Sequence, residues 1–153
     1  MMNRKIRKVA VLGSGVMGSA IACHFANIGC SVLLLDMVPR ELNAKEEKKG
    51  LTLEDKVVRN RLVNGFLTAS LKSKPSPIYK KSFADRIETG NFDDDFEKIN
   101  TCDWVIEVVV ERLDIKKIIF DKVDKYRKPG TLVSSNTSGI PIHMMLEGRS
   151  DDF

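Results

Sequence analysis

Three glycines lie between a short apolar run and a segment with helical spacing. Lys8 to Leu12 reads KVAVL, a β-branched run that predicts a strand. Gly15 to Asn27 carries its apolar residues at helical spacing, and Gly29 stands where a glycine ends a helix. The turn between them is GSGVMG, Gly13 to Gly18. A strand, a G-x-G-x-x-G turn and a helix in this order predict the first β-α unit of a dinucleotide-binding fold.

The turn has a physical reason for each glycine. Gly13 permits the tight turn, Gly15 lets the backbone approach a pyrophosphate, and Gly18 lets the helix pack close to the strand. The pyrophosphate would lie at the positive end of the helix dipole and accept hydrogen bonds from free N–H groups. The alternative is that the glycines serve the turn and the packing alone. The predicted cofactor-binding residues of this turn are Gly13, Ser14, Gly15, Val16, Met17 and Gly18.

Asp36 follows the second apolar run, Ser31 to Leu35, and comes 18 residues after Gly18. An acid at this place accepts hydrogen bonds from the adenosine ribose hydroxyls. Its carboxylate would repel a 2′-phosphate, so NAD is favoured over NADP as the cofactor. A helix-capping or loop aspartate is the alternative.

The order of the expected elements predicts the fold class. Nearly continuous apolar runs, rather than alternating ones, indicate strands covered on both faces. We expect one NAD-binding domain over residues 1–153, an α/β Rossmann-type doubly wound parallel sheet with a helical insertion after the second strand. The expected strands are Lys8–Leu12, Ser31–Leu35, Arg86–Thr89, Trp104–Val110 and Thr131–Ser134, and the expected helices are Gly15–Asn27, a segment from Thr52 to about Lys72, Asp93–Ile99 and Ile115–Tyr126.

The insertion, about residues 45–81, is long and basic. About 50 residues separate Asp36 from Ile87, and about half of that would serve an ordinary crossover. The excess predicts a projecting helical pair, with an apolar stripe at Val57, Val58, Leu62, Phe66, Leu67 and Leu71. Residues 40–81 hold 11 Lys or Arg against 5 Asp or Glu. An anionic partner could bind here, or the charges form a solvated helix face. Interleaved aromatics are lacking, so we expect no nucleic acid.

The composition excludes other classes. The cysteines Cys23, Cys30 and Cys102 are odd in number and form no C-x-x-C pair, which predicts buried free thiols in a cytoplasmic protein. No zinc-ligand spacing occurs, so we expect no metal site. No apolar run approaches the roughly 18 to 20 residues that span a bilayer.

Polar residues follow the two later strands. Glu107 and Glu111 end the fourth expected strand, and Ser135 to Gly139 (SNTSG) follows the fifth. Ligands of open α/β sheets bind outside the carboxyl ends of strands, so either acid could face the nicotinamide ribose and the turn could bind a substrate carbonyl or the nicotinamide. A surface acid and an ordinary polar turn are the alternatives. His24 lies on an apolar stripe and is expected to be a packing residue.

GSGVMG with Asp36, VIEVVVERLDIKK and SSNTSGIPI together resemble the N-terminal NAD-binding domain of the L-3-hydroxyacyl-CoA dehydrogenase family. The resemblance covers nearly the whole chain and is strongest to the long, fused fatty-acid oxidation enzymes. It implies oxidation of the 3-hydroxyl of an acyl-CoA, with hydride passed to NAD. It also implies that the full-length protein can form a homodimer.

The resemblance assigns roles to further residues. Glu111 and Lys116 match positions that contact the nicotinamide side of the cofactor. Ser138 matches a residue that touches both cofactor and substrate, and it is the one candidate catalytic residue in this chain. The basic insertion matches a segment that contributes to the CoA site, with Lys72 and Lys74 as the nearest candidates.

The resemblance also implies that the catalytic histidine lies beyond this chain. The family's histidine follows the SNTS turn at a distance that passes Phe153, and His143 does not match it. By the same resemblance, we expect the helical C-terminal substrate and dimerisation domain to be absent from these residues. We therefore expect the chain to be a fragment that binds NAD without turnover. A dehydrogenase of free 3-hydroxy acids and a non-catalytic nucleotide-binding domain are the alternatives.

Overall fold

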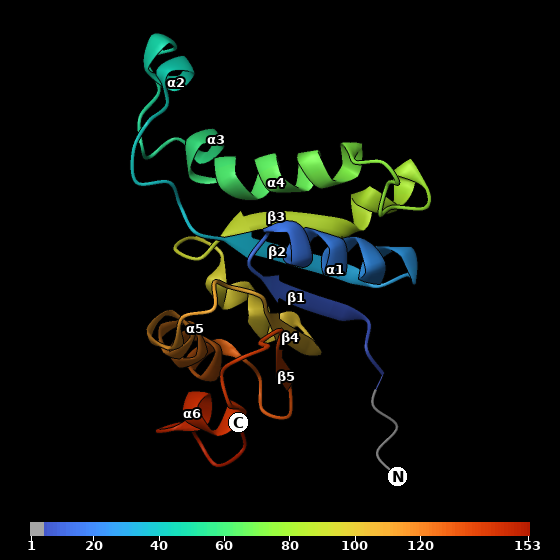
Figure 1. Cartoon of the computed structure of the whole chain (residues 1–153), viewed down its shortest axis with the longest axis vertical. Coiled ribbons are helices and arrows are strands. Elements are labelled where there is room, and N and C mark those ends of the chain that lie inside the picture. Colours follow the sequence, from blue (N-terminus) through green and yellow to red (C-terminus); the bar gives the residue numbers. More distant parts are fainter. Residues whose placement is uncertain (1–4) are drawn as a thin grey trace.

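A five-stranded parallel sheet forms the centre of the computed structural model, which describes residues 5–153 (Figure 1). The strand order is β3-β2-β1-β4-β5, and all four pairings are parallel. This confirms the doubly wound parallel sheet. The strands are β1 (Lys8–Leu12), β2 (Ser31–Asp36), β3 (Ile87–Asn91), β4 (Trp104–Glu107) and β5 (Leu132–Ser135).

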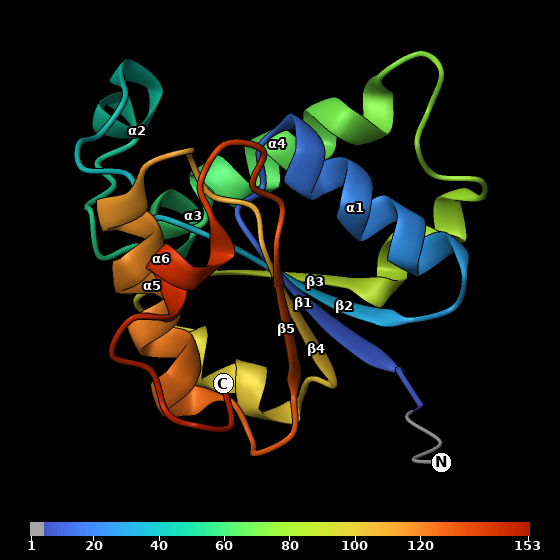
Figure 2. The same cartoon turned by 60° about the horizontal axis from the view of Figure 1, so that its bottom comes forward.

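Helices cover both faces of the sheet (Figure 2). One face is covered by α1 and α4, the other by α5, α6 and a 3₁₀ helix, η2. The α-helices are α1 (Val16–Asn27), α2 (Ala44–Lys48), α3 (Lys56–Arg59), α4 (Arg61–Lys72), α5 (Leu113–Tyr126) and α6 (Ile142–Leu146), and the 3₁₀ helices are η1 (Lys81–Arg86) and η2 (Phe96–Thr101).

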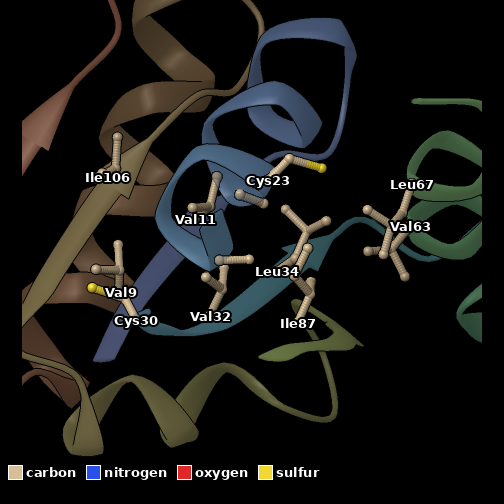
Figure 3. Packing of buried hydrophobic residues seen from close by; sticks show 12 residues of the cluster. Val9, Val11, Cys23, Cys30, Val32, Leu34, Val63, Leu67, Ile87 and Ile106 are labelled. Atoms are coloured by element: carbon tan, nitrogen blue, oxygen red, sulfur yellow. The ribbon is translucent and has the colours of Figure 1, made fainter. Parts of the chain in front are cut away.

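The central strand β1 shows why the apolar runs are continuous. Val9 and Val11 belong to the core under α1 and α4, whereas Ala10 and Leu12 belong to the core under α5. Figure 3 shows the first of these clusters: Val9 and Val11 lie between Ile106 of β4 and the β2 side chains Val32 and Leu34, and Val63 and Leu67 of α4 lie beyond Leu34. Because successive strand residues point to opposite faces, a strand buried on both faces needs an apolar residue at each position.

The insertion after β2 contains three helices rather than the expected pair. Only α2 projects from the body of the molecule (Figure 1). It begins with a capping box between Asn43 and Glu46, and Arg61 of α4 forms an ion pair with Glu46. By contrast, α4 packs on the sheet through Val63 and Leu67. The longest helix of the insertion, which was predicted to project, therefore packs against the sheet.

The long helix expected from Thr52 begins later and is interrupted. Thr52 forms a turn in which its backbone N–H donates to the Asp55 carboxylate at 2.6 Å, and α3 starts after Asp55. Asn60 separates α3 from α4 and accepts a hydrogen bond from Asn91 at 2.8 Å. The predicted stripe is partly wrong, because Val57 and Phe66 are exposed. The prediction assumed one continuous helix through Asn60, so it placed these two residues on the buried face.

Two smaller expectations concern the fourth strand and the cysteines. β4 ends at Glu107, three residues earlier than predicted, because the chain turns away to start α5. The three cysteines are buried and unpaired, as predicted. Within residues 5–153, no helix is both long and apolar enough to span a membrane, and no cluster of possible metal ligands occurs.

Candidate cofactor-binding site

The predicted site residues gather at the carboxyl edge of the sheet. The glycine turn follows β1, Asp36 ends β2, and the segments 108–112 and 136–139 follow β4 and β5. These four strands are parallel neighbours, so their carboxyl ends meet at one edge. Elements far apart in the sequence thus form a single candidate site.

Two glycines of the turn are required by their surroundings. Gly13 has a φ of +111°, and a Cβ there would lie 2.5 Å from the carbonyl oxygen of Val108. A Cβ at Gly18 would lie 1.8 Å from the carbonyl oxygen of Gly13. Nothing lies within 4 Å of the Cβ position of Gly15. That position faces open space, as it must if a ligand is to approach the backbone there.

The N-terminus of α1 is free to bind an anion. Gly15 is its N-cap, no side chain caps the helix, and no acidic residue lies in its first turn. Val16 and Met17 are exposed. The backbone N–H groups of a first helical turn have no partner within the helix, and the helix dipole places positive charge there. The turn therefore fits the pyrophosphate of NAD.

The Asp36 side chain is fixed beside the turn. Its carboxylate accepts hydrogen bonds from the Ser14 N–H at 2.8 Å, from the Ser14 hydroxyl and from the Met37 N–H at 2.7 Å. A carboxylate has about four acceptor positions, so one is left for a ribose hydroxyl. The arrangement fits the adenosine ribose of NAD.

Glu111 lies in the loop after β4, not on the strand. Its carboxylate accepts hydrogen bonds from the Thr137 hydroxyl at 2.5 Å, the Ser138 N–H at 3.1 Å and the Gly139 N–H at 3.0 Å. The Lys116 ammonium lies 3.3 Å away. The Thr137 hydroxyl, the Gly139 N–H and Lys116 together lower the pKa of Glu111 to about 2. The structure thus places Glu111, Lys116 and Ser138 beside one another, and their contact with the cofactor stays a prediction.

Lys116 and Glu107 form a buried ion pair that the sequence did not reveal. Both side chains are 0% exposed, with the Lys116 Nζ 2.8 Å and 2.9 Å from the two Glu107 oxygens. Glu107 is therefore not placed to face a nicotinamide ribose. The signal in the sequence was an acid closing an otherwise apolar run, WVIE, but nothing identified a partner nine residues later.

The remaining candidates lie elsewhere. Lys72 and Lys74 are exposed near the end of α4. The Asn27 side chain, at the far end of α1, bonds the Pro77 carbonyl at 2.8 Å, so this segment lies away from the glycine turn. The expectation that His24 packs on an apolar stripe is wrong, because His24 is exposed; it lies about 13 Å along α1 from Gly15. His143 is exposed on α6.

Comparison with known proteins supports the same reading. Residues 8–152 match the family described as 3-hydroxyacyl-CoA dehydrogenase, NAD binding domain. The chain belongs to this family. It is an NAD-binding domain, and the residues at its carboxyl edge fit that cofactor.

Two relatives and one solved structure illustrate the likeness. A protein described as a probable 3-hydroxyacyl-CoA dehydrogenase of Bacillus subtilis (strain 168) is 57% identical over 152 residues, covering 99% of this chain and 19% of the relative. A peroxisomal fatty acid beta-oxidation multifunctional protein of Oryza sativa subsp. japonica is 32% identical over 144 residues, covering 94% of this chain and 18% of the relative. The crystal structure of 3-hydroxybutyryl-CoA dehydrogenase from Escherichia coli superposes with a TM-score of 0.63 at 26% identity, over 97% of this chain and 28% of that one. The chain thus spans about one fifth of the length of these two relatives.

Proposed function

We propose that this domain serves an enzyme that oxidises (3S)-3-hydroxyacyl-CoA to 3-oxoacyl-CoA with NAD in fatty-acid β-oxidation. The observation that carries the proposal is the shared edge: the glycine turn and Asp36 lie at the same edge of the sheet as Glu111 and the 135–139 turn. The first pair suits the adenosine half of NAD, and the second suits the nicotinamide half and the substrate. The family match supports the same chemistry. The buried free thiols favour a cytoplasmic location.

The residues of this chain bind and orient rather than transfer the proton. NAD supplies the hydride acceptor. The first turn of α1 holds the pyrophosphate and Asp36 holds the adenosine ribose. Ser138 is exposed and its N–H is fixed by Glu111 at 3.1 Å, so its hydroxyl is available to cofactor and substrate. The contacts that lower the pKa of Glu111 to about 2 also hold its carboxylate beside Ser138.

We propose that the general base is a histidine outside these 153 residues. His24 lies well along α1 from the glycine turn, and His143 is not at the family's position. A general base contributes about 10²- to 10⁴-fold to the rate. The isolated chain is therefore expected to bind NAD and leave 3-hydroxybutyryl-CoA unoxidised. Oxidation at an enzyme-like rate of about 1 s⁻¹ or more would contradict this placement of the base.

The substrate class is tested by titrating the NADH-loaded chain with acetoacetyl-CoA and with free acetoacetate. Binding of the CoA ester alone is expected. Preference for the free acid would favour a dehydrogenase of free 3-hydroxy acids. Binding of neither would show that these 153 residues do not bind the CoA ester on their own.

The basic insertion is tested in the same titration. Deleting residues 45–81 would remove Val63 and Leu67 from the core, so point variants are preferable. Replacing the exposed Lys45, Lys48 and Lys49 with Ala is expected to weaken CoA-ester binding, because α2 projects on the side toward which β2 and β3 point (Figure 1). Lys72→Ala with Lys74→Ala is the matched control, and a larger loss there would show that the earlier candidates bind CoA after all.

A further inference from the structure

Glu107 closes β4 with a carboxylate that is completely buried and fully engaged. Both of its oxygens accept hydrogen bonds from Lys116 of α5, at 2.8 and 2.9 Å. One oxygen also accepts from the Val109 N–H at 2.7 Å, and the other from the hydroxyl of Ser135, the last residue of β5. One side chain thus joins the exit of β4, the first turns of α5 and the exit of β5.

Stability alone does not account for a charge at this place. Removing a carboxylate and an ammonium from water is costly, and well-packed apolar residues of similar volume often serve as well or better. Here the pair is 0% exposed on both sides. An apolar side chain in place of Glu107 could not accept hydrogen bonds. It therefore could not hold the Lys116 ammonium and the Ser135 hydroxyl at defined positions.

Each segment that Glu107 fixes leads directly to a group of the candidate site. Its partner Lys116 also lies 3.3 Å from the Glu111 carboxylate. Its partner Ser135 begins the turn whose Ser138 and Gly139 N–H groups donate to Glu111 at 3.1 and 3.0 Å. Glu111 is 40% exposed, so it lies between the buried anchor and the open edge.

We propose that Glu107 is a positioning residue for the nicotinamide half of NAD, acting through Lys116 and Ser135 on Glu111 and the 137–139 turn. The inference rests on the proposed roles of Glu111 and Ser138 at the nicotinamide end. Glu107 does not touch the cofactor. It fixes the segments that carry Glu111 and the 137–139 turn, which neither the glycine turn nor Asp36 contacts through a hydrogen bond in the described structure.

The test compares NAD with ADP on the 153-residue chain by calorimetry. ADP carries the adenosine and the pyrophosphate but lacks the nicotinamide riboside. In Glu107→Gln the affinity for NAD is expected to fall about tenfold or more, the effect of losing a hydrogen bond to a charged group, while the affinity for ADP stays the same. A purely structural role would leave the ratio of the two affinities unchanged in the folded variant, and that result would overturn the inference.

Two further variants complete the test. Ser135→Ala removes one hydrogen-bond donor to Glu107 and leaves the ion pair with Lys116 intact. It is also expected to lower the affinity for NAD relative to ADP, so it can replace Glu107→Gln if that variant does not fold. Glu88→Gln is the matched control, because Glu88 also accepts from a lysine, Lys98, at 2.7 Å, but on the exposed surface of β3. Glu88→Gln is expected to keep the wild-type ratio of the NAD and ADP affinities.

The wild-type chain separates the two claims. If it binds ADP as tightly as NAD, the proposed nicotinamide roles of Glu111 and Ser138 fail, and this inference fails with them. If the wild type prefers NAD and both Glu107→Gln and Ser135→Ala keep that preference, the proposed function stands and the positioning role of Glu107 is wrong.

Discussion

Two single residues at the edge of the sheet, Asp36 and Glu111, have carboxylates that backbone N–H groups hold in place. Asp36 is held by the Ser14 and Met37 N–H groups, and Glu111 by the Ser138 and Gly139 N–H groups. In both cases backbone donors fix a carboxylate that stays partly open to solvent. The side chains are therefore oriented before a ligand arrives, which lowers the entropic cost of binding.

Asp36 is expected to determine the preference for NAD over NADP. Asp36→Ala removes the acceptor for the ribose hydroxyls and the repulsion of a 2′-phosphate. The NAD-to-NADP affinity ratio is expected to fall by about tenfold or more, in line with the loss of a charged hydrogen bond, and calorimetry with both cofactors measures it. A wild-type chain that binds NADP as tightly as NAD would contradict the role of Asp36.

The Glu111 carboxylate is expected to titrate far below an ordinary glutamate. Its pKa falls from 4.5 to about 2, chiefly through the Thr137 hydroxyl and the Gly139 N–H. Because the folded pKa is the lower one, its contribution to stability is complete above pH 4.5 and is lost as the pH falls through about 2. The Gly139 amide signal in an NMR pH titration is expected to move with a midpoint below 3, well under the ordinary value of about 4.3. A midpoint near 4.5, or an identical curve in Glu111→Gln, would show that these contacts do not form in solution.

The elements around the site were predictable from the sequence to different degrees. The turn between β1 and α1 was predictable, because glycines at fixed spacing have known roles there. The buried pair joining β4, α5 and β5 was not, because a lone acid in WVIE does not name its partner. The insertion was misjudged for a related reason: Val57 and Val58 were both placed on the apolar stripe, but in the short α3 only Val58 is buried.

Gly15 and Gly18 are expected to respond differently to alanine. Gly18→Ala places a Cβ 1.8 Å from the Gly13 carbonyl oxygen, so the turn must distort and the free energy of unfolding falls. Gly15→Ala meets nothing within 4 Å and is expected to keep the fold, but its methyl group would occupy the position proposed for the pyrophosphate. Thermal unfolding and NAD titration of both variants separate the effects. If Gly15→Ala binds NAD like the wild type, the pyrophosphate does not lie on this turn.

Lys116 is expected to matter for stability as well as binding. Lys116→Met leaves the buried Glu107 carboxylate without its cation, which typically costs about 3–5 kcal/mol. Adding Glu107→Gln removes that charge, so the double variant is expected to regain most of the loss in urea unfolding. Additive losses in the double variant would mean that the two side chains do not interact.

At the scale of the whole molecule, the parallel sheet determines the site. The continuous apolar runs predicted strands covered on both faces, and the observed order β3-β2-β1-β4-β5 places the ends of β1, β2, β4 and β5 side by side. Residues as distant in sequence as Gly13 and Ser138 therefore belong to one edge. The fold class predicted from the sequence was enough to place these residues at one edge. The individual contacts among them could not be predicted, because they depend on side-chain packing that hydrophobic periodicity does not describe.

One NAD molecule is expected to span this edge from the glycine turn to the 137–139 turn. The most direct measurement is an NMR titration of the ¹⁵N-labelled chain with NAD. The amide signals of Gly15 and Met17 are expected to shift together with those of Ser138 and Gly139, at one common dissociation constant. If only the glycine turn responds, or if the shifts gather at the far end of α1 around Asn27, NAD does not bridge the two halves of this site and the account is wrong.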